Sequence, residues 1–127
     1  MENKKRKIID VHTHVFPEKI AMKAVENVGN YYSIKMGENG TMEGLIESAK
    51  MLDASFVVSN AALKVENVRH GNDFLFECAS IYPDRVVPLG SVHQDMDIKS
   101  ICKVFSVKEK GFCFGNKRNH TKPPDAV

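Results

Sequence analysis

Two histidines near the start of the chain, His12 and His14, have the type and spacing that metal chemistry requires. Residues two apart in an extended strand project to the same side, so both imidazoles, with Asp10 before them, are expected on one face. Two imidazoles that project together can hold one divalent ion; zinc is the first expectation, and other divalent ions remain open. Asp10 would lie behind the ligands and support them. The alternative is a pair of exposed or hydrogen-bonded histidines.

The segment that carries these residues, 8–15, is rich in β-branched side chains and is predicted to be a strand. Ile9, Val11 and Thr13 would form its other face, under the helices. Strands of a parallel sheet are usually buried on both faces. Burying three ionisable groups without partners would cost roughly 1–3 kcal/mol or more per group. This cost favours a metal ion or another partner at the polar face.

Helical and strand-like patterns alternate along the rest of the first 97 residues. Alternation of this kind predicts an α/β fold with parallel strands joined by helices. Pro88, inside the last expected strand, would remove one hydrogen-bond donor from the sheet. The expected helices are 17–28, 41–52 and 65–82, and the expected further strands are 55–62 and 85–92.

Two more polar residues, Asn60 and His93, fall at the carboxyl ends of the second and third expected strands. Side chains at these ends form the rim where barrel enzymes do their chemistry, so each could contact a substrate or an ordered water. A lone rim histidine is more often a hydrogen-bonded surface group. Cys78 lies on the inner side of the expected third helix and is predicted to be a core residue.

The run IIDVHTHVFP, residues 8–17, resembles the opening of the amidohydrolase-related metal enzymes, a group that also includes decarboxylases. Residues 40–60 and 86–97 are similar to later parts of that family. The resemblance implies a (β/α)₈ barrel with a metal site at its carboxyl-terminal rim, with His12 and His14 as ligands and Asp10 as the motif aspartate. The predicted fold is therefore the N-terminal portion of a TIM-like barrel, about three βα units over 1–97, followed by an irregular, poorly ordered basic tail over 98–127.

The resemblance also implies a small carboxylic, amide or ester substrate, and either hydrolysis or non-oxidative decarboxylation with a metal-activated water. The family takes its remaining ligands from later strands, which this sequence does not contain. We therefore expect a truncated or frame-shifted product with weak activity or none. Two alternatives remain open. One is a metal-dependent phosphoesterase or DNase-type barrel, and the other is a non-enzymatic half-barrel that forms homo-oligomers through an open sheet edge.

Composition and charge limit the kinds of protein and the partners that this sequence can represent. With 127 residues the chain has room for one domain, and no apolar run approaches the length of a membrane span. Three widely spaced cysteines give no disulfide framework, which favours the cytoplasm. Residues 1–97 hold 11 Lys and Arg against 14 Asp and Glu, whereas residues 98–127 hold 7 against 2. A basic tail can bind nucleic acid, but no nucleic-acid motif accompanies it, so that partner is not expected.

Overall fold

Four parallel strands form one sheet in the order in which they follow along the chain, β1-β2-β3-β4. The computed structural model describes residues 6–106 and 113–114. The predicted α/β class and parallel pairing are confirmed, and over these residues the sheet is open rather than closed into a barrel. The strands are β1 (Lys7–Thr13), β2 (Asp53–Ser59), β3 (Val86–Gly90) and β4 (Cys113–Phe114).

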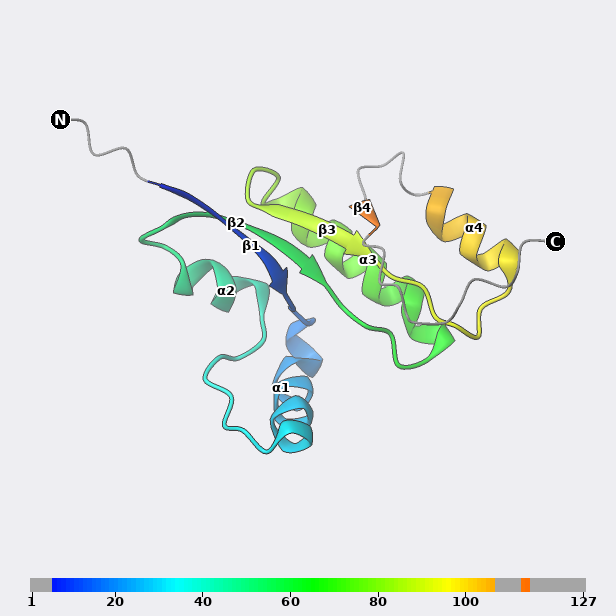
Figure 1. Cartoon of the computed structure of the whole chain (residues 1–127), viewed down its shortest axis with the longest axis horizontal. Helices are drawn as coiled ribbons and strands as arrows, with labels where there is room; N and C mark the ends of the chain where they lie inside the picture. The colour runs from blue at the N-terminus through cyan, green and yellow to red at the C-terminus, as the bar shows by residue number, and fades with distance from the viewer. Residues whose placement is uncertain (1–5, 107–112, 115–127) are drawn as a thin grey trace.

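Helices occupy the connections between the strands. Figure 1 shows α3 lying against β3, and α1 projecting beyond the carboxyl-terminal end of β1. The three predicted helices form, with ends that differ from the expected ones by a few residues, and a fourth, unpredicted helix follows β3. The helices are α1 (Glu18–Tyr32), α2 (Met42–Ser48), α3 (Val65–Ile81) and α4 (Ile98–Ser106).

The first helix was predicted to end at residue 28, just before Gly29, and that prediction is wrong. α1 continues to Tyr32 and ends at Ser33, whose backbone is left-handed with φ 54°. The chain then folds back on the last turn, where the Ile34 amide donates to the Gly29 carbonyl at 3.0 Å. A Cβ at residue 29 would lie 2.9 Å from the Ile34 carbonyl oxygen. Glycine at residue 29 therefore allows the two backbone segments to lie this close together, and it does not end the helix.

The core lies on one face of β2. Ala54, Phe56 and Val58 alternate along this strand and are each at most 4% exposed, as expected for residues that share one side of a strand. They pack with buried residues of both α2 and α3, so these two helices cover the same face of the sheet. Their main partners are Met42, Ala49, Leu75, Cys78, Val86 and Val15.

Ile9 and Val11 were predicted to lie under the helices, and the structure corrects this. They are 60% and 70% exposed. β1 is the edge strand of the sheet, and the helix that follows it extends away from it (Figure 1) instead of covering it. Ile9 also pairs with Ser55, so it projects to the face opposite Ala54 and Phe56, away from α2 and α3.

Pro88 lies within β3, opposite Val58 of β2. A proline is tolerated in a strand at a position where no carbonyl of a neighbouring strand would accept a hydrogen bond from its missing N–H. On the other side of β3, the described residues of β4 pair with Leu89 and Gly90. The proline thus lies before the paired stretch on that side, and the strand forms in spite of it.

The basic segment after residue 97 is described only in part. Residues 98–106 were predicted to belong to an irregular, poorly ordered tail, but they form the helix α4, and residues 113–114 form β4. The predicted poorly ordered tail otherwise falls on 107–112 and 115–127, which lie outside the described residues. Within the described ranges, no helix combines the length and the apolar content needed to cross a membrane.

Candidate metal centre

The imidazoles of His12 and His14 face each other at the carboxyl-terminal end of β1. Their Nε2 atoms lie 3.1 Å apart. The ring centroids are separated by 5.0 Å, with the ring planes at 81°. Both side chains are exposed. The prediction that these two residues share one side of the strand agrees with this geometry.

His14 is oriented by a backbone group of the neighbouring strand. Its Nδ1 lies within hydrogen-bond distance of the Ser59 carbonyl oxygen at the end of β2. A carbonyl can only accept, so Nδ1 carries the proton and donates it, which leaves the lone pair of the ring on Nε2. A histidine that ligates a metal usually makes this same kind of contact with its other nitrogen. His14 is therefore held in the tautomer that ligation requires.

The same tautomer assignment determines how the two rings interact without a metal. Because the His14 Nε2 atom is an acceptor, the hydrogen bond between the rings requires a proton on His12 Nε2. Ligation by His12 would need that proton to move to its own Nδ1 or to leave. A hydrogen bond between the two rings therefore needs the proton of His12 on Nε2, whereas binding of an ion through both Nε2 atoms needs that position free.

Backbone and side-chain hydrogen bonds hold the end of β1 on β2. The Thr13 hydroxyl donates to the Val57 carbonyl at 2.8 Å, next to the contact of His14 with Ser59. The Asn60 amide nitrogen then donates to the Val15 carbonyl. These contacts fix the strand end even though its histidine side chains are exposed.

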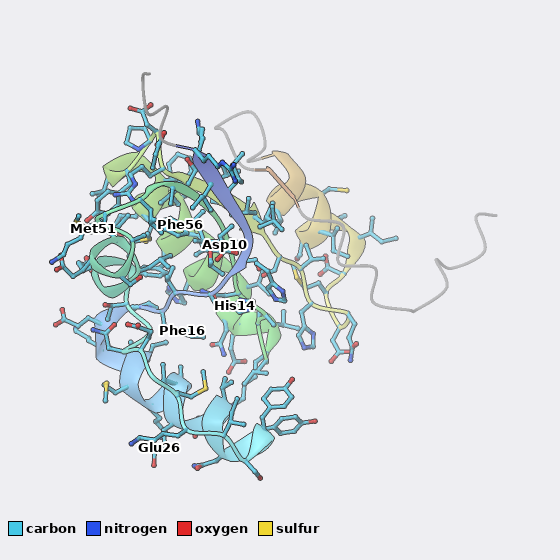
Figure 2. All side chains as sticks on the ribbon, turned by 60° about the vertical axis from the view of Figure 1, so that its left-hand side comes forward. Asp10, His14, Phe16, Glu26, Met51 and Phe56 are labelled. Carbon is cyan, nitrogen blue, oxygen red and sulfur yellow. The ribbon has the colours of Figure 1, made fainter. Side chains whose placement is uncertain are left out.

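The structure corrects the predicted position of Asp10. The register of β1 on β2 shifts between Asp10 and Thr13: Asp10 lies opposite Phe56, and Thr13 lies opposite Val58, so three steps on β1 match two on β2. Since paired residues of parallel strands project to the same side, this bulge puts Asp10 on the side of Phe56 and the histidines on the other. Figure 2 shows Asp10 midway along β1 and His14 near its end.

Asp10 has a local role instead. Its Oδ1 accepts a hydrogen bond from the His12 backbone amide at 3.1 Å. That amide lies within the bulge, where the regular pairing of β1 with β2 is interrupted. Asp10 thus stabilises the bend that brings the histidines to the open side of the sheet, and it supports the site through the backbone rather than through a ring nitrogen.

Asn60 lies at the predicted rim and connects two strand ends. Its amide nitrogen holds the Val15 carbonyl, whereas its Oδ1 is buried without a hydrogen-bond partner among the described residues. A buried acceptor that lacks a partner costs roughly 1–3 kcal/mol. Asn60 is therefore the one predicted rim residue with an unused polar atom beside the end of β1.

His93 lies in the loop after β3, where its side chain is 15% exposed. Its Nδ1 accepts a hydrogen bond from the Asp95 amide at 3.1 Å, and the Asp95 carboxylate lies 3.7 Å from the same nitrogen. The structure does not bring His93 together with His12 and His14 into a three-residue cluster. In the part of the chain that is described, no group of three His, Cys, Asp or Glu residues could hold a metal ion.

The histidine pair fits a metal ion as two of its ligands. Two nitrogen ligands of a tetrahedral zinc ion, each at about 2.0–2.1 Å, lie roughly 3.3 Å apart, close to the 3.1 Å observed between the Nε2 atoms. The exposed rings leave room for water or other ligands at the remaining positions. Among the described residues, the pair offers two candidate ligands.

Two groups that position the rim were not found from the sequence. One is the Ser59 carbonyl, a backbone atom that no side-chain pattern identifies. The other is Asn72, buried in α3, whose amide both donates to the Ser91 carbonyl at 2.9 Å and accepts from the Ser91 amide at 2.8 Å. This pair holds the backbone just beyond the end of β3. The sequence indicates Asn72 only through its polar type at a position between Val68 and Leu75 on the inner face of α3.

No protein-family model, no curated protein and no solved structure matches this chain. The local resemblance of residues 8–17 to amidohydrolase-related enzymes therefore remains an expectation from the motif.

Proposed function

We propose that this protein binds a divalent metal ion, with zinc as the preferred ion, through Nε2 of His12 and Nε2 of His14. The observation that carries the proposal is the opposed pair of ring nitrogens, 3.1 Å apart. The contact of the His14 Nδ1 atom with the Ser59 carbonyl adds to it, because it leaves Nε2 free to ligate. Two imidazoles alone make a weak site, since structural zinc sites use four protein ligands.

The reaction class that we propose comes from the motif. A bound divalent ion would supply Lewis-acid chemistry, polarising a carbonyl or carboxylate group and making water more acidic. We infer a small carboxylic, amide or ester substrate, with hydrolysis or non-oxidative decarboxylation as the reaction. With two ligands from the described residues, turnover by this chain is expected to be low.

The fold supports this proposal at a coarse level. Parallel strands in sequential order, with α2 and α3 packed on one face, are the arrangement expected for part of the wall of a (β/α)₈ barrel. The histidines lie at the carboxyl-terminal end of β1, the end where such barrels hold their active sites. We propose that residues 1–97 correspond to the N-terminal portion of such a barrel.

Metal binding is tested by titrating the purified full chain with Zn²⁺ in calorimetry, and with Co²⁺ while recording visible absorption. We expect one ion per chain and Co²⁺ bands typical of nitrogen ligands. His12→Ala and His14→Ala should each weaken binding roughly tenfold or more, the range seen when a metal site loses a supporting group. His70→Ala is the matched control, because His70 is exposed on α3.

Unchanged Zn²⁺ affinity in the His12→Ala/His14→Ala double variant would show that the ion binds elsewhere. A hydrolysis assay then addresses the reaction class, with a nitrophenyl ester and a nitrophenyl phosphodiester as probes, each measured with and without Zn²⁺. A rate that depends on Zn²⁺ for the phosphodiester alone would favour the phosphoesterase alternative. Rapid ester hydrolysis by a chain that keeps one zinc through dialysis would contradict the expected low turnover.

A further inference from the structure

Among the residues that the structure describes, no strand pairs with the outer edge of β1. β1 ends the strand order of the sheet, so one row of its backbone amides and carbonyls has no partner strand among the described residues. Residues 6–12 are all exposed, and they include large apolar side chains: Ile8 is 43% exposed and Ile9 is 60% exposed. An exposed apolar edge strand is a template for pairing with another strand.

We propose that two copies of this chain pair antiparallel through their β1 edges, about a twofold axis that passes between Ile8 and its copy. Closed twofold dimers are the commonest form of homo-oligomer. The pairing would join two four-stranded sheets into one. This inference goes beyond the proposed metal site and does not depend on it.

The bulge limits the stretch that can pair. Regular pairing of β1 with β2 is interrupted after Asp10, and a bulged strand bends away from a straight partner. The regular part of β1 therefore runs from Lys7 to Asp10, and the exposed Arg6 directly before it extends the stretch to five residues. The residue at the centre of this stretch is Ile8.

Symmetry restricts the register further. Opposite residues of antiparallel strands project to the same face, so a twofold axis perpendicular to the sheet must place one residue opposite its own copy. An axis at Lys7 or at Asp10 would oppose like charges, which is destabilising. An axis at Ile9 would extend the pairing into the bulge at Val11.

An axis at Ile8 avoids these conflicts and brings opposite charges together. It places Arg6 opposite Asp10 of the other copy at each end of the paired stretch, and Ile8 against Ile8 at its centre. Alternation along the strand puts these three residues on one face. The Asp10 Oδ1 atom holds the His12 amide, and its second carboxylate oxygen remains for the guanidinium. Opposite charges across strands favour this register.

Cysteine substitution tests the register directly. Two cysteines at the axis would have Cα atoms within the 4.4–6.8 Å range of disulfides, because directly opposite residues are roughly 4.5–5.5 Å apart. Ile8→Cys should therefore form a disulfide-linked dimer on mild oxidation, in a background where Cys102 and Cys113 are replaced by serine. Ile9→Cys is the matched control. It would lie diagonally from its copy, at about 7–8 Å, and should cross-link at least tenfold more slowly.

Sedimentation velocity on the full chain over a range of concentrations tests the dimer itself. Ile8→Lys should raise the dissociation constant at least tenfold, whereas Ile98→Lys, at a site 80% exposed on α4, should not change it. Arg6→Glu should also weaken the dimer, and adding Asp10→Asn should recover part of the loss. Asp10→Asn keeps an oxygen for the His12 amide while it removes the charge.

The outcomes separate this inference from the metal site. The dimer should persist with either Zn²⁺ or EDTA and in the His12→Ala/His14→Ala variant, since both histidines lie beyond the paired stretch. A wild-type chain that stays monomeric at all concentrations, or faster cross-linking at residue 9 than at residue 8, would overturn the proposal. Loss of the dimer on metal removal alone would also overturn it, by assigning the contact to the metal site.

Discussion

The sheet has a buried region and an exposed one, and the residues suited to chemistry belong to the exposed one. The core unit, made of β2, α3 and β3, holds Phe56, Val58 and Leu75, each at most 4% exposed. The edge unit, made of β1 and α1, exposes most of its apolar side chains and carries His12 and His14. An edge strand contributes little to the core, so polar residues are tolerated on it at little cost in stability.

The exposed region is nevertheless ordered where the chemistry requires it. Hydrogen bonds from Thr13, His14 and Asn60 join the ends of β1 and β2. The core unit thus supplies stability, and its strand end supplies the carbonyl that orients a ring of the edge unit. We therefore expect substitutions in the core unit to change the free energy of unfolding strongly, and substitutions in the edge unit to change it little.

Leu75→Ala tests the core unit most severely. Leu75 is 1% exposed on α3, and removing such a buried side chain costs about 2–5 kcal/mol. Val11→Ala is the matched change in the edge unit, where the side chain is 70% exposed, and it should stay within about 0.5 kcal/mol. Urea unfolding measures both. Equal losses would break the distinction between the two units.

Asn72→Ala tests whether the polar contact of the core unit matters as much as its packing. The change leaves the half-buried amide and carbonyl of Ser91 without their partners, which should cost about 1–3 kcal/mol in unfolding free energy. Asn67→Ala, at an exposed position on the same helix, should be nearly neutral. Alanine is the better helix former, so helix propensity alone would stabilise both variants. A comparable loss in the control would therefore show that the Ser91 contact does not explain the result.

Cys78 gives the core unit a dependence on pH. Burial, with the charges of Glu43 and Glu77, raises the pKa of the Cys78 thiol to about 11 from a usual 9.0. The folded state therefore favours the protonated thiol, so this stabilisation is complete below pH 9 and is lost as the pH rises through 11. At pH 10 the loss should be about 1.4 kcal/mol.

Unfolding free energies measured between pH 8 and pH 10 test whether stability falls with rising pH. The wild-type chain should lose stability more steeply than Cys78→Ala, which has no thiol to titrate at this position. Parallel curves for the two proteins would contradict the assignment. Thiol labelling at neutral pH gives a second readout: the exposed Cys102 should react before the buried Cys78.

The smallest effects are expected at the histidines themselves. His14→Ala removes the contact with the Ser59 carbonyl, and at an exposed position its cost should fall at the lower end of roughly 0.5–1.5 kcal/mol. His12→Ala should cost less still, because the hydrogen bond of its ring among the described residues is with the other exposed ring. Thermal unfolding without metal compares the two. A larger loss for His12→Ala would show that the edge unit depends on the ring pair for its stability.

Much of the fold could be predicted because it follows from local patterns. Alternating strand-like and helical periodicities identified β1, β2, β3, α1, α2 and α3 to within a few residues. The core character of Cys78 followed from its place on a helical stripe, and it is 3% exposed. The ends of α1 were harder to predict, because Gly29 serves a contact with Ile34 that depends on how the chain turns back.

The candidate site was predictable only in part. His12 and His14 could be paired from their spacing, because residues two apart share a side of any extended strand. The same rule failed for Asp10, since the bulge that follows it depends on the pairing of β1 with β2. Asn60 directly follows β2 as predicted, whereas His93 lies in the loop beyond the end of β3. The distance between the two strand ends is a property of the whole sheet.

Taken alone, the amino-acid sequence determined the order of strands and helices and the two imidazoles on one side of β1, because periodicity and spacing act along a single segment. Tertiary structure decided which strand lies at the edge, where the bulge turns Asp10 away, and which carbonyl orients His14. Each of these depends on two segments about 45 residues apart in the chain, as in the contact of His14 with Ser59. Only the folded sheet, in which the segments share hydrogen bonds, brings such groups into contact.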